Sequence, residues 1–339
     1  MRHVVIGGGG FTGGWLVQDL RRDDCEVLVC DVQGQPEVEQ AGASFLRVDV
    51  TDDKSVATLP LTSDDIVYML AARQYHLAVP RRGRGDFFEA VNLEGLRLVL
   101  EHMRRCGCHR MVYFSTDMVY GIPKAIPVGV DHERNPLGEY GLSKKKSEDL
   151  VFEYRKQGMN ITIFRPRLII GPGRLGVLTR LFDAILKNLP VPLIGNGSNS
   201  YQMVSVFDCV SAIRCAVAKG IPNGQYNLGS DNPPSVHRLL GQLIREKGSR
   251  SALIKTPGGL VKLVLAGLDK LGLTVLYREQ FAIADIDYLV DIERTKSELD
   301  WKPMHSDQQM IQAAFDEYVS GGTSQAMLRR VTTSSKSAP

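Results

Sequence analysis

The sequence predicts an α/β fold, built on a doubly wound parallel sheet with a smaller C-terminal lobe. Two observations carry this prediction. Short apolar runs alternate with helical stretches as far as about residue 170, which is typical of parallel sheets covered by helices. Beyond that point, glycine and proline punctuate shorter elements, as in Gly171-Pro172-Gly173 and Gly195-Asn196-Gly197.

Each expected strand is a short apolar run that precedes a turn or a helix. The runs are Arg2–Ile6, Glu26–Cys30, Ser44–Val48, Ile66–Leu70, Met111–Phe114 and Ile161–Phe164. Helices are expected after the first run, over Phe87–Met103 and around Tyr140. In such sheets, ligands bind at the carboxyl ends of the strands. The residues at these ends are Asp31, Asp49, Ala71, Ala72 and Thr116.

The expected domain organisation follows the same change of pattern. Residues 1–170 would form the cofactor-binding domain, and residues 171–325 a substrate-binding lobe that is partly interleaved with it. Residues 326–339 form a polar tail. The segment Gly258–Leu273 is apolar but carries Lys262 and Asp269, so we expect an amphipathic helix over the substrate pocket.

Composition favours a globular enzyme. The chain has 339 residues, of which 43% are hydrophobic and 23% charged, and its net charge is +3. The sequence has no basic stripe of the kind that binds nucleic acid. It also has no run of eighteen apolar residues that could span a membrane. Six cysteines show no metal-binding spacing, so we expect no metal and a reducing, cytoplasmic setting.

The first turn carries a glycine pattern suited to a dinucleotide. The run Arg2–Ile6 leads into Gly7, Gly10 and Gly13, and helical spacing follows. Glycines at such a turn let the backbone approach a pyrophosphate and let the helix pack on the sheet. The amides at the helix N-terminus, around Phe11 and Thr12, would bind its phosphates. The pattern predicts a Rossmann-like nucleotide site.

Asp31 ends the second expected strand, eighteen residues after Gly13. A carboxylate there can accept hydrogen bonds from the adenosine ribose hydroxyls and would repel a 2′-phosphate. No arginine follows it directly. The expected cofactor is therefore NAD rather than NADP.

Tyr140 and Lys144 are four residues apart, so on a helix they share one face. An ordinary tyrosine has a pKa of about 10 and is a poor base at neutral pH. A nearby ammonium group favours the phenolate. The pair could then exchange a proton with an alcohol or a ketone.

Together these motifs resemble the extended short-chain dehydrogenase/reductases of the NAD-dependent epimerase/dehydratase family, over roughly residues 2–320. The resemblance adds Val48-Asp49-Val50, Asn92, Ser115 to Gly121 and Arg165-Pro166. It implies that Asp49 and Val50 border the adenine, and that Ala71 and Ala72 line the nicotinamide side. It also implies that Asn92 supports the active-site geometry, that Thr116 is the catalytic hydroxyl and that Lys144 binds the nicotinamide ribose. A homodimer is expected from the resemblance alone.

The segment Ser115 to Gly121 is similar to that of nucleotide-sugar 4,6-dehydratases, in which a glutamate removes a carbon-bound proton. Here Met118 stands at that position, and a thioether cannot accept a proton. Asp117 remains as a candidate acid. Ordinary 4,6-dehydration is therefore not expected.

Three functional hypotheses stay open at this point. The first is an NAD-dependent enzyme of a nucleotide sugar, epimerase- or dehydratase-like, with a small-molecule substrate. The second is a dehydrogenase or reductase of a hydroxysteroid-like or other apolar secondary alcohol, favoured by Leu168, Tyr201 and the apolar segment 258–273. For a sugar substrate, Arg167, Arg174 or Arg180 could contact the diphosphate. The third is a non-catalytic NAD sensor, which the complete Thr116, Tyr140 and Lys144 set disfavours.

Overall fold

The structure is a computed structural model that describes residues 1–34, 42–75, 79–173 and 178–320. Its centre is a seven-stranded sheet in which every pairing is parallel, in the order β10-β6-β5-β4-β1-β2-β3. The strands are β1 (His3–Ile6), β2 (Val27–Asp31), β3 (Ser44–Arg47), β4 (Ile66–Met69), β5 (Arg110–Phe114), β6 (Asn160–Pro166) and β10 (Gln225–Leu228). The predicted doubly wound, Rossmann-like fold is confirmed, and its strand order reverses between β1 and β4.

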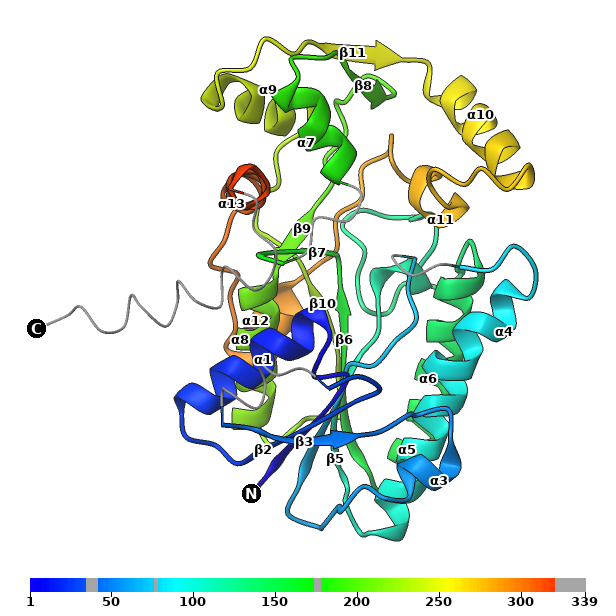
Figure 1. The fold of residues 1–339 in the computed structure, drawn as a ribbon, viewed down its shortest axis with the longest axis vertical. Coiled ribbons are helices and arrows are strands. Elements are labelled where there is room, and N and C mark those ends of the chain that lie inside the picture. The colour runs from blue at the N-terminus through cyan, green and yellow to red at the C-terminus, as the bar shows by residue number, and fades with distance from the viewer. Residues whose placement is uncertain (35–41, 76–78, 174–177, 321–339) are drawn as a thin grey trace, which may run out of the picture.

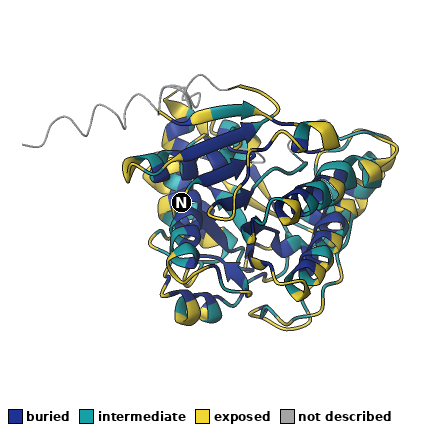
Figure 2. Ribbon diagram, turned by 90° about the horizontal axis from the view of Figure 1, so that it is seen from below, coloured by how far each residue is buried: buried dark blue, intermediate teal, exposed yellow. Residues whose placement is uncertain are grey.

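Helices cover both faces of this sheet (Figure 1). On one face lie α1 (Phe11–Arg22), α8 (Val206–Ala218) and α12 (Glu293–Leu299). On the other lie α3 (Asp53–Val56), α4 (Arg84–Glu89), η1 (Ala90–Gly95), α5 (Leu96–Arg105) and α6 (Glu139–Lys156). The inner strands of the sheet are consequently buried, the edge strand β3 is only partly buried, and the outer faces of the helices are exposed (Figure 2). A sheet covered on both sides accounts for the continuous apolar runs in its strands.

Two hydrophobic clusters fill the spaces between sheet and helices. Val5 of β1 packs with Leu16 of α1 on one face, and its neighbour Ile6 packs with Leu100 of α5 on the other. Successive residues of a strand point to opposite faces, so one apolar strand contributes to both clusters. This double burial fixes the carboxyl ends of the strands, where the site is built.

The smaller lobe stands beyond the carboxyl ends of the strands (Figure 1). It contains α7 (Leu178–Leu186), α9 (Val236–Glu246), α10 (Gly258–Lys270), α11 (Arg278–Phe281) and the pair β8 (Val191–Ile194) with β11 (Leu253–Thr256). A second small pair joins β7 (Leu168–Ile170) to β9 (Met203–Ser205), and α13 (Asp307–Val319) packs against the lobe. A 3₁₀ turn, η2 (Asp117–Val119), follows β5.

The chain passes between the two parts more than once. After β7, α7 and β8, it returns to the large sheet, where α8 packs on α1 and β10 pairs with β6. The small strands were not predicted from the sequence: each has only three or four residues, and Pro192 interrupts the apolar pattern of β8.

The helix expected over Phe87–Met103 extends from Arg84 to Arg105 and contains a π-helical turn, η1. Such turns are rare and occur frequently at functional sites. This one places Asn92 at a buried position, 1% exposed.

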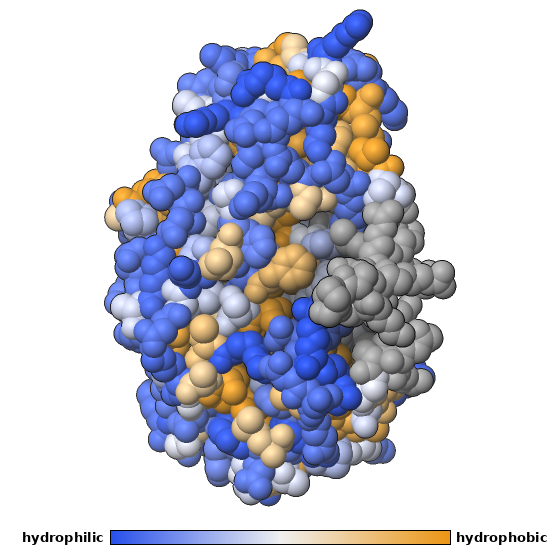
Figure 3. Space-filling view, turned by 90° about the vertical axis from the view of Figure 1, so that its left-hand side faces the viewer, coloured by the Kyte–Doolittle hydropathy of each residue, from blue (hydrophilic) through white to orange (hydrophobic). Residues whose placement is uncertain are grey.

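Hydrophilic residues predominate on the face of the molecule shown in Figure 3, where apolar residues appear in small groups. In the described ranges, no helix is long and apolar enough to cross a membrane.

Candidate active site

The glycine loop joins β1 to α1 at the point where the strand order reverses. Gly7 has a φ of +84°, and a Cβ there would lie 2.7 Å from the Ala71 Cα. A Cβ on Gly13 would lie 2.7 Å from the Gly8 Cα. Gly10 is exposed and caps α1 without a side-chain hydrogen bond. The loop is thus tight where it packs and open at its tip, as a pyrophosphate site requires.

Asp31 lies beside this loop at the end of β2. Its carboxylate accepts hydrogen bonds from the Gly9 N–H at 3.0 Å and the Val32 N–H at 2.8 Å. Strand β3 pairs with β2, and the Val48 N–H just after β3 donates to the Asp31 carbonyl. Exposed Asp49 follows, and hydrogen bonds from Thr51 lower the pKa of its carboxyl. Val50 is buried against the Gly95 position of η1.

Asn92 connects the β4 end of the site to α6. Its side-chain amide donates to the Ser143 hydroxyl at 2.9 Å and to the Arg73 carbonyl at 3.1 Å, and its oxygen accepts the Arg73 N–H. Ala71 and Ala72 are half-buried just before Arg73. Asn92 therefore fixes the loop after β4 against the helix that carries Tyr140 and Lys144.

Tyr140 and Lys144 occupy the first turns of α6, and both side chains are buried. The Lys144 ammonium donates to the Phe114 carbonyl at 2.6 Å and lies 4.5 Å from the Tyr113 ring centroid. Burial lowers the pKa of Lys144 to about 7. The sequence predicts a positive charge at Lys144, and burial of the amine opposes that charge.

Thr116 and Asp117 stand at the end of β5, where the Thr116 hydroxyl caps η2. Its contacts to the Met118 N–H and the Asp117 carboxylate are both long, at 3.3 Å. Asp117 forms a buried ion pair with Arg167, whose guanidinium lies 4.1 Å from the Tyr288 ring centroid and 4.5 Å from that of Tyr201. The pair holds Asp117 as part of a packed cluster.

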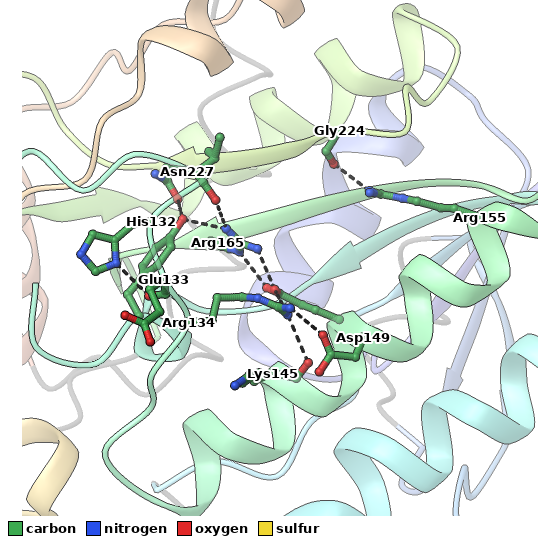
Figure 4. Close-up of polar contacts among 12 residues, drawn as sticks. His132, Glu133, Arg134, Lys145, Asp149, Arg155, Arg165, Gly224 and Asn227 are labelled. Carbon is green, nitrogen blue, oxygen red and sulfur yellow. Dashed lines mark hydrogen bonds and ion pairs between the residues drawn. The ribbon is translucent and has the colours of Figure 1, made fainter. Parts of the chain in front are cut away.

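Beneath the site, Arg165 fastens α6 to the sheet (Figure 4). Its guanidinium donates to both carboxylate oxygens of Glu148, at 2.8 and 2.7 Å, and to the Tyr120 hydroxyl at 2.9 Å. Tyr120 in turn donates to Asn227 of β10. Arg134 adds a bond to Glu148 at 3.0 Å. This buried network links α6, β6 and β10 below Tyr140.

A carboxylate that the sequence analysis did not single out also reaches the site. Glu279 of α11 is 2% exposed and lines a small pocket with Met118, Gly121, Leu137 and Ile283. Glu279 lies 161 positions after Met118 in the chain and brings a carboxylate to the same pocket. No local sequence signal could have identified it.

The candidate diphosphate contacts have different surroundings. Arg167 is buried in its ion pair with Asp117, Arg180 is exposed on α7, and Arg174 lies outside the described residues, as does the polar tail.

Leu168 packs into the core of the smaller lobe. On α10, Leu260 and Leu263 are 59% and 70% exposed and so face outward. In the part of the chain that is described, no group of histidine, cysteine or acidic residues could hold a metal ion.

Comparisons with known proteins place this geometry in context. The model of the NAD-dependent epimerase/dehydratase family matches residues 3–229. An uncharacterized protein, y4nG, of Sinorhizobium fredii is 29% identical over 317 residues, or 93% of this chain and 78% of that protein. A putative UDP-glucose 4-epimerase of Methanocaldococcus jannaschii is 28% identical over 74% of this chain and 84% of that protein.

A likeness in fold extends over almost the whole chain. The solved structure of the UDP-glucose 4-epimerase of Thermotoga maritima with UDP-glucose has a TM-score of 0.76 at 23% identity. The match covers 95% of this chain and 99% of that chain. The similarity therefore includes the smaller lobe as well as the large sheet.

Proposed function

Because the chain belongs to the NAD-dependent epimerase/dehydratase family, we propose that it epimerises a nucleotide sugar by oxidising one carbon and reducing the same carbon again. The chain is an enzyme whose cofactor is NAD. Several relatives are named for an activity on nucleotide sugars, such as the putative UDP-glucose 4-epimerase, and one is named a 2-alkyl-3-oxoalkanoate reductase. The specific reaction is the proposal.

The described residues fit the cofactor. Gly10 leaves the N-terminus of α1 open, and Asp31 stands beside the same loop. When bound, NAD supplies the acceptor and donor for the hydride. The residues proposed to hold it are Gly7, Gly10, Phe11, Thr12, Gly13, Asp31, Asp49, Val50, Ala71, Ala72, Asn92, Tyr140 and Lys144.

Tyr140 is proposed to take the proton of the substrate hydroxyl as its carbon is oxidised, and to return it after reduction. Thr116 orients the substrate oxygen, since its long contacts at 3.3 Å can be exchanged for a bond to substrate. Lys144 would bind the ribose hydroxyls, which would give its buried amine polar partners. No atoms are gained or lost by the sugar, and only the configuration at one carbon changes.

The observation that favours epimerisation over elimination is the pairing of Asp117. Elimination needs a base at a neighbouring carbon and an acid for the leaving hydroxyl. Met118 cannot be the base, and Asp117 is bound in a buried ion pair with Arg167. Epimerisation needs neither group.

The apolar-alcohol alternative loses the features that favoured it. Leu168 is part of the core of the smaller lobe, Tyr201 packs against Arg167, and the exposed leucines of α10 point outward. We therefore propose no second function.

Product analysis tests the proposed reaction. We expect incubation with common UDP- and dTDP-hexoses to yield an epimer and no 4-keto-6-deoxy sugar, because Met118 cannot act as the base and Asp117 is paired with Arg167. Mass spectrometry and NMR of the sugar product distinguish the two. A 4-keto-6-deoxy product would show that elimination proceeds and would identify Glu279 as the first base to test.

A second prediction concerns cofactor choice. We expect at least tenfold tighter binding of NAD than of NADP, because Asp31 would face the 2′-phosphate, and Asp31→Ala should remove most of that preference. Asp64→Ala, which removes an exposed carboxylate just before β4, is the matched control and should leave the ratio unchanged. Equal affinities of the wild type for both dinucleotides in a titration would contradict the assignment of Asp31.

A further inference from the structure

Glu279 joins the smaller lobe to the first turn of α6. Both oxygens of its carboxylate face the Gly141 N–H, at 3.2 and 3.3 Å, and it also accepts from the Tyr140 N–H. Tyr140 is the residue on which the proposed function depends. The Glu279 side chain, 139 positions from Tyr140 in sequence, therefore contacts the backbone of that residue directly.

Tyr75 provides a second connection. Its hydroxyl is hydrogen-bonded to the Glu279 carboxylate. Its ring stacks on Tyr277 at 4.1 Å and meets the Tyr140 ring edge-on, with centroids 5.5 Å apart. Glu279 is thus coupled to Tyr140 through the backbone and through the ring that packs on it.

The sequence of α6 leaves room for this contact. Its N-cap residue is Gly138, which has no side chain to satisfy the first amides. A Cβ there would lie 2.8 Å from the Glu279 Cγ. Carboxylates stabilise helix N-termini through the free amides and the positive end of the helix dipole. Here the capping group comes from the other lobe.

We propose that Glu279 is a positioning residue for Tyr140, holding the first turn of α6 and setting the electrostatic environment of the phenol. The inference rests on the proposed role of Tyr140. It assigns a function to a residue that lies in neither the glycine loop nor the Tyr140–Lys144 motif.

The charge of Glu279 has a defined effect on Tyr140. Burial raises the pKa of the Glu279 carboxyl from 4.5 to about 7, so above neutral pH it is an anion beside the Tyr140 backbone. An anion there opposes formation of the Tyr140 phenolate. The other ionisable groups around Glu279 are Tyr75, Glu139, Tyr140, Tyr277, Arg278 and, over the Tyr277 ring, Arg84.

Two substitutions separate position from charge. Glu279→Ala removes the cap, and we expect kcat to fall about tenfold because Tyr140 loses its fixed position, while the Kd for NAD stays within twofold. Glu279→Gln keeps an oxygen that can accept the Gly141 N–H, so it should restore most of kcat. Without the charge, the Tyr140 phenol should ionise more readily, so its titration should move to lower pH.

The phenol titration needs no turnover. The ultraviolet difference between each protein and its Tyr140→Phe counterpart, followed with pH, reports Tyr140 alone. The thermal stability of each variant is measured alongside the titration.

Because the folded state binds the Glu279 proton more tightly than the unfolded state, this group favours folding less as pH rises from 4.5 to about 7. Glu279→Gln should therefore melt no lower than the wild type at pH 8.

Glu317 supplies a matched control. It is also a buried glutamate of the smaller lobe that caps a backbone amide, that of Gly173 at 2.7 Å. Glu317→Ala and Glu317→Gln should leave the Tyr140 titration in place. A wild-type kcat in Glu279→Ala, or an unshifted phenol titration in Glu279→Gln, would overturn the inference. An active Tyr140→Phe enzyme would instead overturn the proposed function, whatever the Glu279 variants do.

Discussion

Tyr140→Phe is expected to lower turnover at least 10²-fold, the usual range for losing a general acid–base group. The substitution removes one hydroxyl from a side chain that packs between Tyr75 and Phe88, so the fold should persist. The Kd for NAD should change little, because the pyrophosphate and adenosine contacts are assigned to Gly7–Gly13 and Asp31. Steady-state kinetics and a binding titration measure both quantities.

Two companion variants sharpen this prediction. Tyr154→Phe removes a hydroxyl from the same helix, fourteen residues further on, and should keep wild-type turnover. Lys144→Ala should weaken both turnover and NAD affinity, because the lysine is assigned to both. A Tyr140→Phe enzyme with near-normal turnover would remove the proposed mechanism.

The largest expected effect on stability lies beneath the site, at Arg165. Arg165→Met leaves Glu148 buried with only Arg134 as a cationic partner, and removing one member of a buried ion pair typically costs about 3–5 kcal/mol. Because Arg134 remains, we expect a loss near the lower end, about 3 kcal/mol, in the free energy of unfolding. Urea denaturation measures it.

A double variant shows whether the loss comes from an uncompensated charge. Arg165→Met combined with Glu148→Leu should recover much of the stability, since no buried carboxylate is then left behind. The control is Lys156→Met, which breaks an exposed pair with Glu153 and should cost less than about 1 kcal/mol. If Arg165→Met costs no more than the control, the network does not anchor α6.

The sequence predicted those features that are written locally. Strands β1, β2, β4, β5 and β6 are apolar because both faces of the sheet are covered, whereas β10, with the polar Gln225 and Asn227, was not predicted. The glycine loop must be free of side chains at Gly7 and Gly13 because backbone lies within 3 Å of their Cβ positions. Asp31 could be identified because it ends the second strand, eighteen residues after Gly13 in the sequence. These signals depend on a few neighbouring residues and on strand and helix periodicity.

The remaining features depend on contacts between distant segments. Glu279 reaches α6 only because α11 folds over its N-terminus, and Arg167 is buried only because Asp117, Tyr201 and Tyr288 surround it. The outward-facing leucines of α10 could not be distinguished from a pocket lining by periodicity alone. In each case the residue type was visible, but its partner was set by tertiary packing.

The most direct test of the proposed reaction follows the hydride itself. A nucleotide hexose deuterated at the carbon whose configuration changes is incubated with the enzyme and NAD, and the products are examined by NMR and mass spectrometry. Epimerisation predicts that the epimer keeps the deuterium at that carbon, that no solvent hydrogen enters the neighbouring carbon and that reduced cofactor does not accumulate. Stoichiometric release of reduced NAD with an oxidised sugar, or deuterium moved to a 6-deoxy carbon, would contradict the account.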